Sequence, residues 1–140
     1  MIIEANGILM GYDLTGNPDG PVITLSHSLA TTREMWWPQL GTLEDNYRIL
    51  RYDTRGHGET QAPEGDYTLE TLAQDLFGLL DGLNIEKTHY VGLSMGGMVG
   101  QIAALAEPDR FVTLALCDTS SQIPSTVHPT WEERIDLART

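Results

Sequence analysis

Short apolar runs alternate with helical patterns along most of the chain. The runs that predict buried strands are Val22–Leu25, Tyr47–Tyr52, Tyr90–Leu93 and Phe111–Leu116. Between the second and third runs, leucines recur every three or four residues from Leu69 to Leu83, which is typical of an amphipathic helix. Thr68 precedes this stripe as an N-cap and Gly82 lies near its end, so both boundaries of the helix are marked.

The N-terminal segment predicts a hairpin. Ile2–Ala5 and Ile8–Leu14 flank Asn6-Gly7, a dipeptide favoured in two-residue turns. A hairpin followed by alternating strands and helices predicts an α/β fold with a mostly parallel sheet and helices on both faces. Such sheets bind ligands beyond the carboxyl ends of their strands. Polar residues stand at three of these ends, in Ser26–Ser28, Asp53–Arg55 and Ser94.

The third of these positions carries the strongest motif in the chain. Gly92-Leu93-Ser94-Met95-Gly96 has the G-x-S-x-G pattern of a nucleophile elbow. It stands between the Tyr90–Leu93 strand and a predicted helix, Met98–Glu107, which Pro108 ends. In an elbow the serine is strained and its neighbours pass close to other backbone, where only glycine fits. A glycine-rich turn that happens to contain serine is the alternative, but the strand–helix setting favours a nucleophile.

Composition limits the classes of partner. The chain has 140 residues, enough for one domain, and a formal net charge of −12, which argues against nucleic acid or an anionic membrane surface. No apolar run approaches the roughly 18 residues that span a bilayer, and the N-terminus does not resemble a signal peptide. The lone Cys117 fits a reducing, cytoplasmic location. No spacing predicts a metal or a nucleotide, so no cofactor is expected.

Together these residues resemble the α/β-hydrolase superfamily, and within it the β-ketoadipate (3-oxoadipate) enol-lactone hydrolases and related cofactor-free esterases. The resemblance is carried by Ser26–Thr31 with Met35-Trp36, by Arg51–Gly58, by Gly92–Gly97 and by Leu116–Thr119. It implies that residues 1–120 form the N-terminal part of a hydrolase core. Residues 121–140, with a predicted helix at Pro129–Arg139, would begin a cap over the site.

The resemblance also implies chemistry. Ser94 would attack a carboxylic ester or lactone and form an acyl-enzyme, with the backbone amides of Leu29 and Met95 as the oxyanion hole. Trp131 would wall the acyl pocket, and Arg134 would meet a substrate carboxylate. The favoured substrate is the enol-lactone of an oxo-dicarboxylic acid. The alternatives are simple carboxylesters, peracid formation, and a non-catalytic module that only binds a ligand.

The resemblance makes His27 a positioning residue and suggests that Asp53 and Arg55 brace the loops. In this fold the acid and histidine of the triad follow later strands, and none of the four histidines does so here. Ser94, Asp118 and His128 occur in the right order, but no strand separates the last two. This compact triad is therefore the weaker alternative.

The chain is thus expected to be the N-terminal piece of a longer hydrolase, cut or split within the cap. A second polypeptide would supply the C-terminal half, including the triad acid and histidine. Without that half, the Phe111–Leu116 strand would be an open, apolar edge of the kind that invites association. A naturally short protein that dimerises through the same edge is the alternative.

Overall fold

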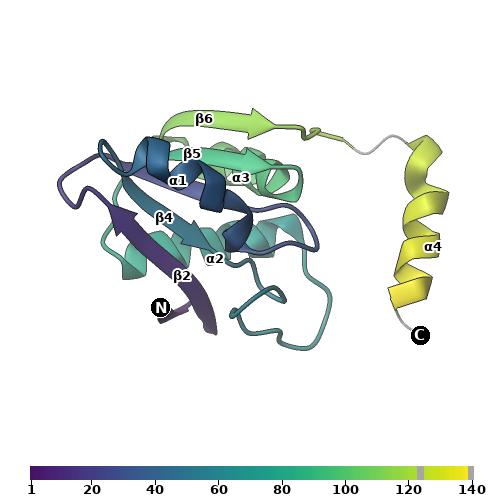
Figure 1. The fold of residues 1–140 in the computed structure, drawn as a ribbon. Coiled ribbons are helices and arrows are strands. Elements are labelled where there is room, and N and C mark those ends of the chain that lie inside the picture. Colours follow the sequence, from purple (N-terminus) through teal and green to yellow (C-terminus); the bar gives the residue numbers. More distant parts are fainter. Residues whose placement is uncertain (123–124, 139–140) are drawn as a thin grey trace.

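The computed structural model describes residues 1–122 and 125–138, and its centre is a six-stranded sheet (Figure 1). The strands lie in the order β1-β2-β4-β3-β5-β6. Their bounds are Ile2–Ala5 (β1), Ile8–Gly16 (β2), Val22–Ser26 (β3), Arg48–Tyr52 (β4), Thr88–Leu93 (β5) and Phe111–Cys117 (β6). All six predicted strands are present, with ends that differ from the predicted ones by a few residues.

Strand pairing confirms a mostly parallel sheet with an N-terminal hairpin. β1 and β2 pair antiparallel, and Asn6 (φ 47°) and Gly7 (φ 74°) between them both take the left-handed conformation that a tight two-residue turn requires. β2 then pairs antiparallel with β4. The pairs β4–β3, β3–β5 and β5–β6 are all parallel. The carboxyl ends of the last four strands therefore meet at one edge of the sheet.

Helices cover both faces of this sheet, as the alternation of patterns predicts. On one face α2 (Leu69–Gly82) and α3 (Met95–Ala106) pack side by side. On the other, α1 (Trp37–Leu43) follows a short 3₁₀ turn, Arg33–Trp36. The α2 leucine stripe is completely buried at Leu76, Leu79 and Leu80. Burial of such side chains is the main stabilising term of the layer, at about 1.5–3 kcal/mol each.

Two elements differ from the sequence expectation. The pattern does not predict α1, because the helix has only seven residues and contains Pro38 and Gly41. It is held by tertiary packing of Trp36 and Leu40 on Ile23 and Leu25 of β3. The helix after the elbow begins at Met95 rather than Met98, since the elbow leads directly into the first turn although Gly96 and Gly97 are poor helix formers.

The last helix of the chain stands apart from the sheet. Short 3₁₀ turns, Pro108–Arg110 and Ser125–Val127, precede β6 and α4 (His128–Ala138), respectively. α4 lies clear of the sheet, beyond the carboxyl ends of the parallel strands (Figure 1). The predicted end of this helix at Arg139 lies outside the described residues. The division into a core of residues 1–120 and a cap from 121 stays a prediction.

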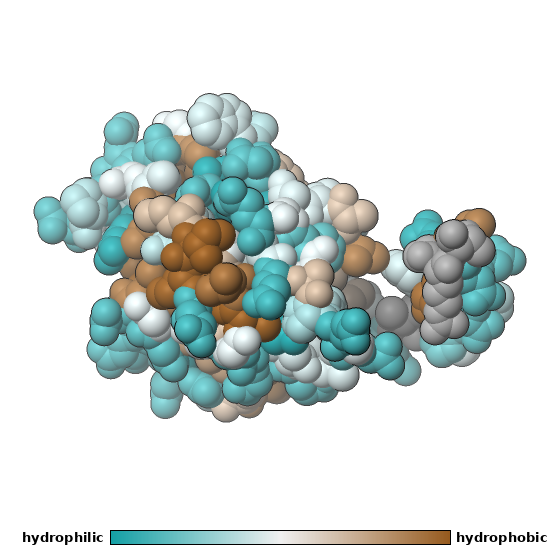
Figure 2. All heavy atoms as spheres, turned by 90° about the horizontal axis from the view of Figure 1, so that it is seen from below, coloured by the Kyte–Doolittle hydropathy of each residue, from teal (hydrophilic) through white to brown (hydrophobic). Residues whose placement is uncertain are grey.

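The sheet ends at β6, which has no further strand beside it in the described chain. Its apolar side chains are only partly covered: Val112 is 55% exposed and Leu116 40%. Seen from below, the surface of the main part of the molecule is mostly polar but carries a compact apolar group, and α4 is set apart from it (Figure 2). None of the helices within residues 1–122 and 125–138 is both long and apolar enough to cross a lipid bilayer.

Candidate active site

The turn from β5 into α3 has the geometry of a nucleophile elbow. Ser94 takes φ 53° and ψ −111°, a strained conformation for a residue with a side chain. A Cβ on Gly92 would overlap the Gly96 carbonyl, and a Cβ on Gly96 would overlap the Ser26 carbonyl. Both glycines are therefore required sterically, as the motif predicts. The elbow places Ser94 directly before the first turn of α3.

Both backbone polar groups of Ser94 are held by the end of β6. The Ser94 N–H donates to the Cys117 carbonyl at 2.9 Å. The Ser94 carbonyl accepts from the Thr119 hydroxyl at 2.7 Å, and also from the Met98 N–H at 3.1 Å. The sequence pattern alone assigns no role to the Thr119 side chain, although its position just after a strand end is a usable signal. The loop after β6 thus fixes the strained peptide of Ser94.

The buried phenol of Tyr90 holds the elbow on its core side. Tyr90 is completely buried on β5, and its hydroxyl donates to the Gly96 carbonyl at 2.7 Å. Burial is the largest cause that raises the pKa of Tyr90 well above its ordinary value. The phenol therefore stays protonated and keeps its donor, so the first turn of α3 is fixed on the core side.

The loop after β3 supplies the second backbone amide near the serine. Leu29 and Ala30 are the central residues of a turn in which the Thr31 N–H donates to the Ser28 carbonyl at 3.3 Å. Ala30 takes φ 58°, the left-handed conformation that the third residue has in a type II turn. Within the described chain the Leu29 N–H donates to no acceptor. Met95, as the first residue of α3, likewise presents a free helix N-terminal amide.

Four of the five predicted site residues line one cavity. This cavity, of about 140 Å³, is bounded by Leu29, Ser94, Met95, Met98 and Trp131. A serine hydroxyl, two candidate oxyanion amides and an apolar wall therefore meet at one place. The positive end of the α3 dipole lies at the same point and favours negative charge. This is the arrangement that stabilises a tetrahedral oxyanion.

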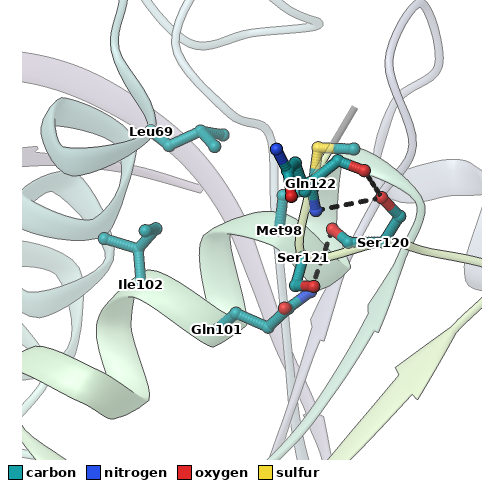
Figure 3. Close-up of a pocket in the computed structure, with 7 residues that line it drawn as sticks. All are labelled: Leu69, Met98, Gln101, Ile102, Ser120, Ser121 and Gln122. Atoms are coloured by element: carbon teal, nitrogen blue, oxygen red, sulfur yellow. Dashed lines mark hydrogen bonds between the residues drawn. The ribbon is translucent and has the colours of Figure 1, made fainter. Parts of the chain in front are cut away.

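A second cavity of similar volume, about 140 Å³, shares Met98 with the first (Figure 3). Its walls come from α2, α3 and the connection after β6: Leu69, Met98, Gln101, Ile102, Ser120, Ser121 and Gln122. The Gln101 side chain donates to the Ser120 carbonyl at 3.3 Å. The lining contains no ionisable group, so this cavity adds no acid or base to the site.

The fifth predicted residue, Arg134, is not part of the cavity wall. Its guanidinium stacks on Trp131, 5.0 Å from the ring centroid. This cation–π contact joins two residues of the same helix, α4. Arg134 therefore lies next to a wall residue of the cavity without lining it.

The compact triad is not assembled. Asp118 is exposed at the end of β6 and His128 is exposed at the start of α4, and neither side chain is hydrogen-bonded to Ser94 in the described part of the chain. Within residues 1–122 and 125–138, the Ser94 hydroxyl has no hydrogen-bond partner. His89 lies at the amino end of β5 and bonds to Thr113 at 2.9 Å. Within the described residues, the Ser94 hydroxyl therefore lies beside two unpaired amides and has no histidine or carboxylate as a hydrogen-bond partner.

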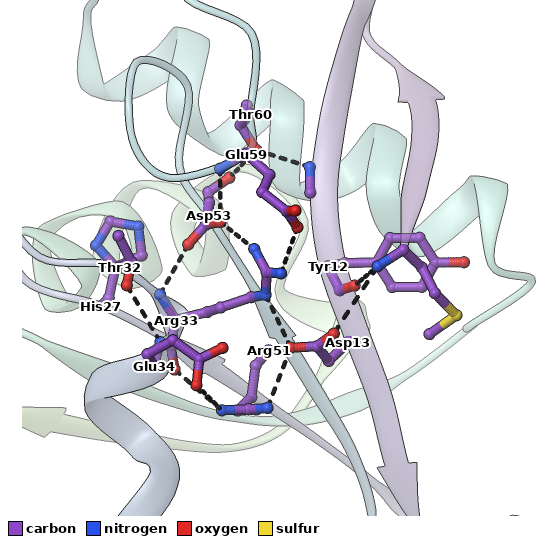
Figure 4. A network of polar contacts seen from close by, with 12 residues as sticks. Tyr12, Asp13, His27, Thr32, Arg33, Glu34, Arg51, Asp53, Glu59 and Thr60 are labelled. Carbon is purple, nitrogen blue, oxygen red and sulfur yellow. Dashed lines mark hydrogen bonds and ion pairs between the residues drawn. The ribbon is translucent and has the colours of Figure 1, made fainter.

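A charged network braces the loops, as expected for Asp53 (Figure 4). The Asp53 carboxylate is completely buried and accepts from the Arg33 N–H at 2.8 Å and the Glu59 N–H at 3.0 Å. It also pairs with the Arg33 guanidinium, which reaches Asp13 on β2 at 2.8 Å. The network ties the segment after β3 to the loop after β4.

Arg55 braces the same loop on its other side. It makes two hydrogen bonds of 2.6 Å to Asp75 on α2, which is buried. Asn6, in the N-terminal hairpin turn, donates to the same carboxylate at 2.7 Å. Bidentate pairs of this kind are geometrically specific. The loop after β4 is therefore fixed to α2 and to the hairpin.

Comparison with known proteins identifies the family. The sequence model of the alpha/beta hydrolase fold matches residues 21–138. The chain belongs to the α/β-hydrolase family. 3-Oxoadipate enol-lactonase 2 of Acinetobacter baylyi is 35% identical over 137 residues, which cover 98% of this chain and 51% of that protein. The chain spans about half the length of the curated relatives it matches.

Solved structures agree on the fold. The enol-lactonase from Burkholderia xenovorans superposes with a TM-score of 0.94 at 42% identity, covering 100% of this chain and 54% of that one. A thermophilic esterase from Thermogutta terrifontis superposes with a TM-score of 0.88 at 34% identity, covering 99% and 52%. This chain therefore corresponds to the N-terminal portion of an α/β-hydrolase fold, as its motifs predict.

Proposed function

We propose that this chain, together with the remaining half of the fold, forms a serine hydrolase that cleaves a carboxylic ester or lactone. One observation carries the proposal. Ser94, in a strained elbow at the head of α3, shares a cavity with Leu29 and Met95, whose amides are free. A partly buried serine that lines a cavity beside two unpaired amides is the arrangement needed for acyl transfer.

The reaction follows from this arrangement. A histidine of the C-terminal half accepts the Ser94 proton while the oxygen bonds to the substrate carbonyl carbon. The carbonyl oxygen becomes an oxyanion and accepts hydrogen bonds from the Leu29 and Met95 amides. The intermediate then collapses, the C–O bond to the leaving group breaks, and the leaving oxygen takes the proton. Water, activated by the same histidine, releases the acid and restores Ser94.

Substrate class is proposed from the cavity and from the relatives. A cavity of about 140 Å³ with leucine, methionine and tryptophan walls suits a small, largely apolar acyl group. The named relatives include enol-lactonases, which favours the enol-lactone of an oxo-dicarboxylic acid. Because the net charge of −12 repels anions, such a substrate needs a local cation. Arg134, stacked beside Trp131, is the candidate once the cap is complete.

The missing half of the site is proposed to dock along β6. This strand ends the sheet with exposed apolar side chains, and the described chain supplies no base for Ser94. The remaining cap, the triad acid and the histidine would come from a longer chain or from a second polypeptide. The interface would resemble a divided protein core.

A fluorophosphonate probe, applied to the complete assembly, tests the proposal. We expect labelling at Ser94, and loss of both labelling and ester turnover in Ser94→Ala, because the covalent intermediate cannot form. Ser121→Ala, in the neighbouring cavity, is the matched control and should label normally. An assembly that binds ligands but never labels would instead support the non-catalytic module.

Substrate panels separate the remaining alternatives. The likeness to an esterase favours simple carboxylesters as the second candidate class. Lactones, short-chain esters and acid plus peroxide should therefore be compared on the same preparation. A preference for the enol-lactone that disappears in Arg134→Gln would support the proposed carboxylate contact. Unchanged preference in that variant would remove Arg134 from the proposal.

A further inference from the structure

Two histidines from different loops meet beside the oxyanion turn. His27 follows β3 and is completely buried, while His57 belongs to the turn after β4. Their ring centroids are 5.0 Å apart, with the planes inclined at 56°. The proposed chemistry uses neither ring, and in the described part of the chain neither ring is hydrogen-bonded to Ser94.

Their hydrogen bonds are reciprocal. The Nε2 atom of His27 accepts from the Thr54 N–H of the loop after β4 at 2.9 Å. The Nε2 atom of His57 accepts from the Ala30 N–H of the oxyanion turn at 3.3 Å. Each Nδ1 atom faces a nearby carbonyl, that of Ser28 for His27 at 2.7 Å and that of Arg55 for His57 at 3.2 Å.

These partners fix the protonation of both rings. A backbone N–H can only donate and a carbonyl can only accept, so each Nε2 must be unprotonated and each Nδ1 must carry the hydrogen. Both histidines are therefore neutral in this arrangement. Burial is the largest cause that lowers the pKa of His27, which agrees with a neutral ring.

Neighbouring charges act on the pKa of His27 in both directions, since His57 lowers it and Asp53 raises it, and burial has the larger effect. Asp53 faces His27, but its carboxylate is occupied by Arg33 and by the Glu59 N–H. Arg55, next to His57 in the same turn, is paired with Asp75 on α2. Asp53 and Asp75 are thus both engaged by arginines.

The His57 contact acts on the peptide that joins Leu29 to Ala30. Ala30 is held at φ 58°, a left-handed conformation that costs an alanine of order 1 kcal/mol or more. The turn therefore needs an outside contact to keep this shape. We infer that His57 is a positioning residue: by accepting the Ala30 N–H it holds the oxyanion turn so that the Leu29 amide faces the Ser94 cavity. The inference rests on the proposed function.

Two substitutions of His57 distinguish a role in positioning the turn at Ala30 from a general structural role. Glutamine places its amide oxygen about as far from the backbone as Nε2, so His57→Gln keeps an acceptor for Ala30. Asparagine reaches only as far as Nδ1, so His57→Asn keeps the contact to Arg55 but loses the one to Ala30. His89→Gln, at the amino end of β5, is the matched histidine control.

The test uses the complete enzyme, labelled with ¹⁵N. We expect NMR to show the Nδ1-protonated tautomer of His57, and a protected Ala30 amide in the wild type, His57→Gln and His89→Gln. That protection should be lost in His57→Asn. With a short-chain ester, kcat should fall about tenfold in His57→Asn and less than about threefold in His57→Gln, with KM unchanged, because a displaced oxyanion donor weakens only transition-state binding.

Two results would overturn the inference. One is an active enzyme in which the Asn and Gln variants have the same kcat and the same Ala30 protection. The other is a change in KM with no change in kcat. Failure of the proposed function looks different: a wild-type assembly without ester turnover refutes the hydrolase proposal, while the Ala30 amide still reports whether His57 holds the turn.

Discussion

Replacing Thr119 by valine removes one hydrogen bond from the proposed nucleophile and little else. The Thr119 hydroxyl donates to the Ser94 carbonyl at 2.7 Å, and its side chain fills the space above Gly97. Valine has the same shape, so this packing is kept. A methyl group cannot approach a carbonyl oxygen as closely as a hydroxyl, however, so the Ser94 peptide and the loop after β6 must separate slightly.

The cost follows from what remains. The Ser94 carbonyl keeps its bond from the Met98 N–H at 3.1 Å, so no buried acceptor is left without a donor. Loss of one neutral hydrogen bond then reduces the free energy of unfolding by about 1 kcal/mol. In the complete assembly, about twice the length of this chain, the unfolding midpoint should fall by roughly 2–4 °C. A shift of a few tenths of an ångström at the nucleophile should lower kcat roughly three- to tenfold, since larger misplacements cost more.

Thermal unfolding and single-turnover acylation of the complete assembly measure the two effects separately. Thr119→Ser is the control, because it keeps the hydroxyl and loses only a methyl group. Serine should therefore preserve the acylation rate better than valine, although its packing is poorer. If valine acylates as fast as wild type while serine is slower, the methyl group rather than the hydroxyl matters, and the reasoning from the Ser94 carbonyl is wrong.

Two further variants test other parts of the site. Gly96→Ala should reduce the free energy of unfolding by more than about 2 kcal/mol and abolish fluorophosphonate labelling, because the new Cβ overlaps the Ser26 carbonyl. Gly41→Ala, where no atom lies within 4 Å of the new Cβ, should be neutral or stabilising. If Gly96→Ala and Gly41→Ala unfolded at the same urea concentration, the steric argument for Gly96 would be wrong. Because the pKa of folded His27 is lowered from 6.5, the unfolded state binds the proton more readily. The free energy of unfolding should therefore fall as pH drops below about 6.5 and level off below the folded pKa. Urea titrations across this range should show that the free energy of unfolding depends less on pH in His27→Gln than in the wild type.

Local sterics explain why the elbow and the hairpin could be predicted from the sequence. Gly92 and Gly96 are dictated by contacts within a few residues and by one neighbouring strand. Asn6-Gly7 fixes the hairpin in the same way, through two left-handed residues. Such constraints need no knowledge of the rest of the fold. The strand-end motifs then follow from topology, since parallel strands bring their carboxyl ends together.

Contacts between distant segments explain what the sequence did not reveal. α1 forms because Trp36 and Leu40 pack on β3, not because its own residues favour a helix. The partner of Ala30 is His57, which lies in another loop and gave no periodic signal. The Thr119 hydroxyl reaches Ser94 only because β6 lies beside β5. Each of these depends on a pairing that one sequence does not disclose.

The position of β6 links the elbow to the uncovered edge of the sheet. Cys117 and Thr119 hold both backbone polar groups of Ser94, so the strained peptide depends on the end of this strand. Yet β6 is the edge strand, and Val112 and Leu116 on it are exposed. Edge strands with little buried surface open more readily than central ones. Whatever covers β6 therefore also stabilises the elbow. Under the proposed function, the half of the fold that brings the base to Ser94 also holds the nucleophile in place for that base.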